Sequence, residues 1–217
     1  MNYTDVLWDF NGTILDDVDA CIRCANRLLA AHGLPTLASP EAYRAVFGFP
    51  IVEYYRRLGF DFSKISYDAL AVEWVRYYRE EMQDVALCPE VISTLERFRA
   101  AGLRQQILSA THKNLLEEQT RKLGIHALFD DFLALDNIHA HSKVDVGRAW
   151  RAAYPAARPV MLGDTDHDAE TARAIGADCI LLTTGHQGRD TLERLPVRAV
   201  CDTLAEAASL VLGDQSP

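Results

Sequence analysis

The chain has 217 residues, which is enough for one core domain with a sizeable insertion or for two small domains. Hydrophobic residues make up 49% and charged residues 24%, a balance that excludes a fibrous or disordered chain. The net charge of −9 argues against nucleic acid as a partner, whereas a small phosphorylated substrate is compatible with it if a bound cation supplies positive charge.

The sequence also bears on the compartment. It lacks an apolar run of the roughly 18 residues that span a membrane, and its first residues show no signal-peptide pattern. Five scattered cysteines indicate reduced thiols, and the C-x-x-C pair Cys21 and Cys24 lies in a helix-like stretch that favours structural thiols. We therefore expect a cytoplasmic protein without a membrane partner, and leave monomer and homodimer open.

The first predicted element is a buried strand at residues 6–8. Residues 17–85 follow, and they show helical periodicity and no convincing strand. The rest alternates short apolar runs, predicted to be strands, with predicted helices. The strands are 107–108, 132–135, 160–162, 179–182 and 199–201, and the helices are 91–101, 114–123, 144–153, 169–175 and 204–212.

This alternation predicts an α/β fold in which a Rossmann-like parallel sheet carries helices on both faces. We expect the α/β core to comprise residues 1–16 and 86–217. Residues 17–85 would form an inserted all-helical cap over the carboxyl ends of the strands, where ligands of such sheets bind.

Two acidic strand ends carry the strongest signal for chemistry. Asp9 leaves the first strand and is followed by Asn11, Gly12 and Thr13, so that its carboxylate lies at the ligand-binding edge. The segment 160–168 repeats this design with three aspartates in five residues, of which helix capping explains one. Their mutual repulsion is best offset by a hard divalent cation, and Mg²⁺ typically uses one or two carboxylates.

Two further strand ends fit the same edge. Ser109, Ala110 and Thr111 offer hydroxyls and backbone N–H groups suited to phosphate oxygens. Lys143 follows a short polar turn and could neutralise both Asp9 and a phosphoryl group. The neighbouring His139 and His141 are interpreted as part of a solvated loop, because no third metal ligand is evident. Each feature alone is weak evidence for a phosphate site, and the prediction depends on their occurring together at one edge of the sheet.

In this order, the motifs Asp-Phe-Asn-Gly-Thr, Leu-Ser-Ala-Thr, Ser-Lys and Gly-Asp-Thr-Asp-His-Asp resemble the haloacid dehalogenase superfamily, in its phosphoglycolate phosphatase-like branch with a small helical cap. The resemblance covers nearly the whole chain and implies a phosphatase of small phosphorylated metabolites. Its implied nucleophile is Asp9, which would form an aspartyl phosphate. The implied Mg²⁺ ligands are Asp9, the Asn11 carbonyl, Asp164 and Asp168. The groups implied to bind phosphate are Gly12, Thr13, Ser109, Ala110 and Lys143.

Asn11 departs from the family pattern, which usually has a second aspartate there to protonate the leaving group and then activate water. An amide cannot donate a proton and later take one back, so Asn11 removes a contribution of about 10²–10⁴ in rate. The favoured reading is a slow phosphatase acting on substrates with good leaving groups. Three alternatives stay open: a recruited group such as Asp16, Asp17 or His32, a deliberate replacement of a native aspartate, or hydrolysis of a phosphonate or carbon–halogen bond.

A rival from another class is a catalytically impaired protein that binds or senses a phosphorylated metabolite. Asn11 favours it, whereas the retained Asp9, Lys143 and Asp164 favour an enzyme, because a protein that only binds has no obvious need for a nucleophile.

Overall fold

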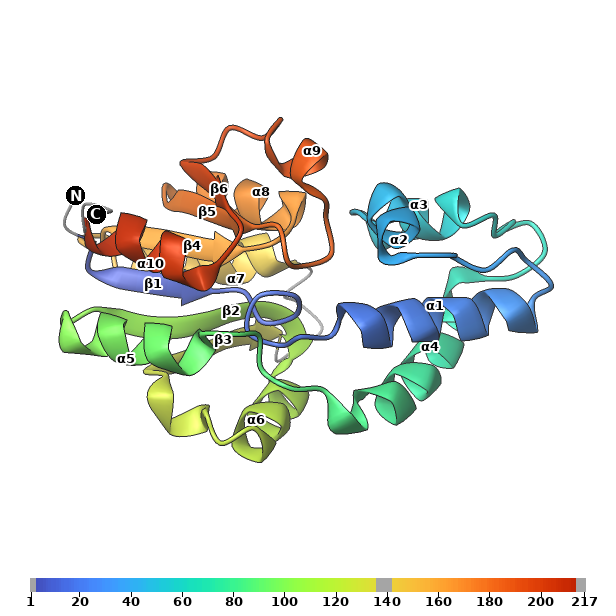
Figure 1. Cartoon of the computed structure of the whole chain (residues 1–217), viewed down its shortest axis with the longest axis horizontal. Helices are drawn as coiled ribbons and strands as arrows, with labels where there is room; N and C mark the ends of the chain where they lie inside the picture. Colours follow the sequence, from blue (N-terminus) through green and yellow to red (C-terminus); the bar gives the residue numbers. More distant parts are fainter. Residues whose placement is uncertain (1–2, 136–141, 214–217) are drawn as a thin grey trace.

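The computed structural model describes residues 3–135 and 142–213, and its central feature is a parallel six-stranded sheet in the order β3-β2-β1-β4-β5-β6 (Figure 1). This confirms the predicted fold class. The order places β1 in the middle, between β2 and β4. The strands are β1 (Asp5–Trp8), β2 (Arg104–His112), β3 (Asp131–Leu135), β4 (Pro159–Gly163), β5 (Asp178–Leu182) and β6 (Ala199–Cys201).

The predicted helices are present, with small shifts at their ends. The helix predicted from 169 begins at Asp166, because Thr165 and Asp168 form a capping box. Helix α9 was not predicted. The helices are α1 (Val18–Ala31), α2 (Pro40–Val46), α3 (Ile51–Arg57), α4 (Tyr67–Glu81), α5 (Val91–Ala100), α6 (Lys113–Lys122), α7 (Lys143–Ala153), α8 (Asp166–Ile175), α9 (Arg189–Leu192) and α10 (Leu204–Leu212), with 3₁₀ turns at Met82–Asp84 and His126–Leu128.

Both faces of the sheet are buried, which explains why its strands are apolar without alternation. In β1, Val6 and Trp8 belong to one core cluster, and Leu7 belongs to another. The first cluster includes Phe98 of α5, and the second includes Trp150 of α7. Strand β1 is therefore packed on both faces of the sheet, and this packing positions Asp9, the residue that follows it.

Strand β2 is longer than the apolar run that predicted it, because two glutamines are buried within it. Gln105 Nε2 donates to the Leu95 carbonyl at 2.8 Å, and Gln106 Nε2 donates to Asp5 Oδ1 at 2.9 Å. These bonds satisfy the NH₂ groups of both amides, whereas the Oε1 atoms of both glutamines are buried without a hydrogen-bond partner among the described residues. Because the partners are distant in sequence, the strand's start could not be read from its local pattern.

Helices α1–α4, here called the helical segment, lie between β1 and α5 in the chain and have a core cluster of their own. It includes Leu28, Tyr43, Tyr54 and Leu70, which are at most 2% exposed. Figure 1 shows these helices beyond the end of the sheet toward which β1 points. The helical segment therefore lies over the edge at which the predicted site residues follow the strands.

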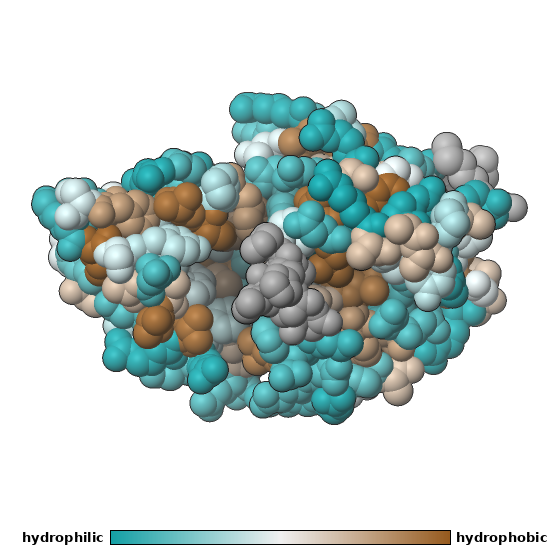
Figure 2. Space-filling view, turned by 180° about the vertical axis from the view of Figure 1, so that it is seen from behind, coloured by the Kyte–Doolittle hydropathy of each residue, from teal (hydrophilic) through white to brown (hydrophobic). Residues whose placement is uncertain are grey.

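The face of the molecule shown in Figure 2 is mostly hydrophilic. In Figure 2, hydrophobic side chains occur in small separate patches on both the helical segment and the core. Within residues 3–135 and 142–213, no helix combines the length and the apolar character needed to cross a membrane. The predicted loop histidines, His139 and His141, lie outside the described residues.

Candidate active site

The register of the sheet brings the predicted strand ends to one edge. Trp8 is paired with Ile107 of β2 on one side and with Leu162 of β4 on the other. Asp9 and Asp164 follow β1 and β4, and Ser109 lies in the last part of β2, so the three residues are at nearly the same level. Since parallel strands end at the same edge of a sheet, these side chains converge as expected.

Lys143, the first residue of α7, joins two of the aspartates. Its side chain is 2% exposed, and its Nζ donates to Asp9 Oδ1 and, at 2.5 Å, to Asp168 Oδ1. Burial alone would lower the pKa of Lys143, but the charges of Asp168 and Asp9 outweigh it and hold the pKa above its usual value. The lysine is therefore a permanent cation beside Asp9.

Asp168 uses both carboxylate oxygens within the protein. While Oδ1 faces Lys143, Oδ2 accepts hydrogen bonds from the backbone N–H of Asp164 at 3.1 Å and from the N–H and hydroxyl of Thr165 at 2.9 and 2.7 Å. These contacts fix the lysine and shape the acidic loop. That Asp168 is also a metal ligand stays a prediction.

Asp164 is fully buried, and the chain leaves room for it with two glycines. Its Oδ2 accepts from the backbone N–H of His186 at 2.6 Å, and its Oδ1 accepts from the Thr13 hydroxyl at 3.3 Å. A Cβ added at Gly12 or Gly185 would lie 2.3 or 2.1 Å from Asp164 Oδ2. The structure thus places Gly12 and Thr13, predicted to bind phosphate, against a predicted metal ligand.

The charge balance of this group fits a divalent cation. Ligand atoms of Asp9, Asp164 and Asp168 lie within 4.8 Å of one another, and one lysine, Lys143, contacts Asp9 and Asp168. Burial and the charge of Asp168 raise the pKa of Asp9 despite Lys143, and burial raises that of Asp164 to about 6. Oxygen donors carrying excess negative charge are those preferred by Mg²⁺.

Ser109 lies beside this group on the β1–β2 side of the edge. It is 2% exposed, and its hydroxyl accepts from the Thr111 backbone N–H at 3.1 Å. The pairing of β2 with β3 shifts register between Leu108 and His112. This irregularity turns the backbone at the strand end, as bulges do beside active sites, and it leaves Ala110 exposed.

The side chain of Asn11 is fully engaged. Its Nδ2 donates to Asp17 Oδ2 at 2.7 Å and to the Tyr78 hydroxyl at 2.9 Å, while its Oδ1 accepts from the Thr111 hydroxyl at 3.2 Å. Tyr78 belongs to α4, so the residue at the usual acid position is held partly by the helical segment. Sequence reasoning missed Tyr78, because nothing in the periodicity of α4 marks one tyrosine for this contact.

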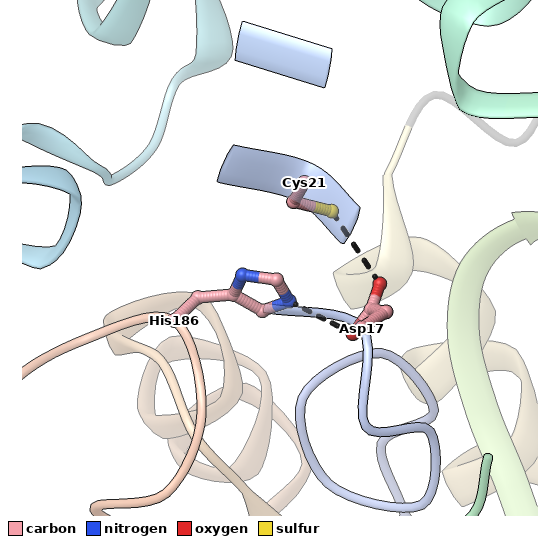
Figure 3. A group of neighbouring side chains, drawn as sticks. All are labelled: Asp17, Cys21 and His186. Atoms are coloured by element: carbon pink, nitrogen blue, oxygen red, sulfur yellow. Dashed lines mark hydrogen bonds and ion pairs between the residues drawn. The ribbon is translucent and has the colours of Figure 1, made fainter. Parts of the chain in front are cut away.

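A second buried group adjoins the first and was missed as a group. Figure 3 shows Asp17 between Cys21 and His186, with His186 Nε2 3.2 Å and Cys21 Sγ 3.5 Å from its carboxylate. Burial disfavours both charges, but their attraction lowers the pKa of Asp17 and raises that of His186 to about 9. Because these atoms have protein partners, the group fits a hydrogen-bonded ion pair.

Two other residues considered as recruited groups lie elsewhere. Asp16 is exposed, and its backbone N–H donates to the Ala86 carbonyl. His32 follows α1 at the end opposite Asp17, about 20 Å away at a rise of 1.5 Å per residue. There its Nε2 lies 3.1 Å from Glu73 Oε2. Of the three candidates, Asp17 alone contacts Asn11.

The chain resembles known phosphatases in sequence and known hydrolases in fold. The chain is 24% identical over 209 residues to a phosphoglycolate phosphatase of Pseudomonas syringae pv. tomato, covering 91% of this chain and 76% of the relative. It is 22% identical to that of Rhodobacter capsulatus, covering 96% of each. A haloacid dehalogenase-like hydrolase structure from Streptococcus pneumoniae superposes with a TM-score of 0.75 at 20% identity, covering 96% of this chain and 98% of the other.

The model of one enzyme family matches residues 6–182, from the first strand to the end of β5. The match therefore includes Asp9, Ser109, Lys143 and the acidic loop with Asp164. It confirms the predicted family and enzyme class. The chain belongs to the haloacid dehalogenase-like hydrolase family.

Proposed function

We propose that this protein is a Mg²⁺-dependent phosphatase that hydrolyses the phosphate monoester of a small metabolite through an aspartyl phosphate on Asp9. The observation that carries the proposal is the Asp9 carboxylate at the end of the central strand, paired with buried Lys143 and beside buried Asp164. The relatives named phosphoglycolate phosphatases support a small phosphorylated substrate.

Asp9, the Asn11 carbonyl and Asp164 would hold Mg²⁺, which when bound supplies positive charge to a phosphate and its nucleophile. An oxygen of Asp9 attacks phosphorus, the bond from phosphorus to the leaving oxygen breaks, and an acyl phosphate forms on Asp9. Lys143 is placed to reduce repulsion between the two anions. Water then cleaves the acyl phosphate, which releases inorganic phosphate and restores the Asp9 carboxylate.

The leaving oxygen must be protonated or be stable as an anion. Asn11 cannot provide this proton, and both of its N–H bonds are used by Asp17 and Tyr78. We therefore propose that the enzyme acts best on acyl or aryl phosphates, and that hydrolysis of the aspartyl phosphate is its slow step.

Residues 17–85 are proposed to be the cap that covers this site and selects the substrate. Three contacts between the helical segment and the core support this assignment. Tyr78 accepts from Asn11, Arg44 donates to the Gly185 carbonyl at 2.8 Å, and the ring of Phe49 packs 4.6 Å from that of His167. A cytoplasmic location and the absence of nucleic-acid partners stay predictions.

The test is a burst assay with p-nitrophenyl phosphate in Mg²⁺ and in EDTA, followed by intact-mass measurement. We expect Mg²⁺-dependent release of p-nitrophenol, with a phosphate adduct that Asp9→Asn abolishes. A burst with little further turnover would place the slow step after attack. No release and no adduct in Mg²⁺ would overturn the proposal, and phosphate binding retained by Asp9→Asn would then favour a protein that only binds.

A further inference from the structure

Asp17 is a buried carboxylate that the proposed attack on phosphorus does not use. It precedes α1, is fully buried, and contacts the nucleophile's loop directly. Its Oδ2 accepts from Asn11 Nδ2 at 2.7 Å, and its Oδ1 accepts from the Gly12 backbone N–H at 2.8 Å. A carboxylate that accepts several N–H bonds is held in its ionised form. Asp17 is therefore an acceptor built into this loop.

His186 fixes the other side of Asp17. Its Nε2 lies 3.2 Å from Asp17 Oδ1 (Figure 3), and its Nδ1 lies 2.9 Å from the Tyr43 hydroxyl of α2. Its backbone N–H donates to Asp164. Both ring nitrogens are thus engaged, and one residue ties Asp17 to a predicted metal ligand. The carboxylate has little freedom to turn away from Asn11.

The amide of Asn11 matches this acceptor in a way that a carboxylate does not. Because Asp17 Oδ2 has no proton to give, the NH₂ group of Asn11 must face it, which sets the amide orientation. An aspartate at position 11 in the same conformation would put an acceptor oxygen 2.7 Å from that oxygen. Two like charges at this distance in a buried site repel strongly.

We propose that Asp17 is a positioning residue that selects an amide at position 11. Asn11 and Asp17 then form a matched pair, in which one side chain donates a hydrogen bond and the other accepts it. The two roles can be exchanged between the positions, but the pair cannot consist of two acceptors. Asn11→Asp alone then duplicates the acceptor. The exchanged pair, Asn11→Asp with Asp17→Asn, restores one donor and one acceptor at the same total charge. It also places the usual acid at position 11.

The test compares four proteins: the natural chain, Asn11→Asp, Asp17→Asn and the exchanged double variant. Stability is measured by urea unfolding, and turnover by p-nitrophenyl phosphate hydrolysis in Mg²⁺. We expect each single variant to be less stable than the natural chain and the double variant to recover most of the loss. Its kcat should exceed that of Asn11→Asp by tenfold or more, with little change in KM.

The control pairs Asn11→Asp with Asp19→Asn, which removes an exposed charge two residues further along the chain. It should recover neither stability nor kcat. If Asn11→Asp alone does not fold but the exchanged variant does, the matched pair is supported. An Asn11→Asp variant as stable as the natural chain, or single effects that simply add in the double variant, would overturn it.

The turnover arm rests on the proposed function, whereas the stability arm does not. A chain that hydrolyses nothing would still show coupling between positions 11 and 17 if the pair is matched. Coupling in stability without turnover in any variant would therefore reject the phosphatase and keep the pair. Turnover in the natural chain without coupling would reject the pair and keep the phosphatase.

Discussion

The excess negative charge around Asp9 predicts that Mg²⁺ stabilises this protein even without substrate. The group contains three carboxylates, Asp9, Asp164 and Asp168, and one lysine, Lys143, which contacts Asp9 and Asp168, so with all three carboxylates ionised its net charge is about −2 before a metal binds. A ligand that binds only the folded state at 100 times its dissociation constant stabilises it by about 2.7 kcal/mol. For a chain of this length, that corresponds to a rise of roughly 5–10 °C in Tm.

The gain should also depend on pH. Burial raises the pKa of Asp164 to about 6, above its unfolded value of 3.8. The folded state therefore binds the proton more tightly, and this contribution to stability, complete below pH 3.8, is lost as pH rises through about 6. Because Mg²⁺ replaces the lost proton, its effect on Tm should be larger at pH 8 than at pH 5.

Thermal melts in Mg²⁺, in EDTA, and in KCl of equal ionic strength measure this effect. The natural chain should show the shift in Mg²⁺ alone, and Asp164→Asn should lose most of it. Asp166→Asn is a suitable control, because Asp166 is a half-buried aspartate at the start of α8 and its Oδ1 accepts from the side chain of Gln187. An equal shift in Asp164→Asn, or a shift that KCl reproduces, would refute the assignment of the cation to this group.

Three further outcomes are expected. Gly12→Ala should lower the free energy of unfolding in urea by about 2–5 kcal/mol, because φ is +74° and the new Cβ meets Asp164. Gly33→Ala is the control: its φ is +67° but its Cβ would meet nothing, so it should lose only the part that is due to backbone strain. Lys143→Met should lower p-nitrophenyl phosphate turnover by at least about 10²-fold and destabilise the fold by roughly 3–5 kcal/mol, since its carboxylates stay buried. The folded state raises the pKa of His186 from 6.5 to about 9, and the resulting contribution to stability is complete below pH 6.5 and is lost as pH rises through about 9. His186→Gln should therefore flatten the fall in Tm between these two pH values.

The parts of the site that sequence predicted are those that follow local rules. Short apolar runs ending in Asp9, Ser109 and Asp164 indicated buried strands, and parallel topology alone brings their ends to one edge. The order of the motifs added Lys143. These inferences need no knowledge of side-chain contacts, because the alternation of strands and helices predicts a parallel sheet and the strands of such a sheet end at one edge.

The network around Asn11 could not be derived in the same way. The residues of this network come from positions up to 169 residues apart in the sequence. Taken singly, Asp17 is interpreted as a helix start, Tyr78 as a core tyrosine and His186 as a loop histidine. One signal was available for His186: it follows the predicted strand 179–182, and the rule applied to the other strand ends would have marked it. No such rule marks Tyr78.

The distribution of charge explains why an amide suits position 11. Asp9, Asp164 and Asp168 share their group with one lysine, which leaves an excess negative charge that a single divalent cation balances. Asp17 and His186, which adjoin this group, balance each other. A carboxylate at position 11 would add a charge that neither group can neutralise. Asn11 adds no charge, but it cannot protonate the leaving oxygen, so turnover should fall steeply as the pKa of the leaving group rises.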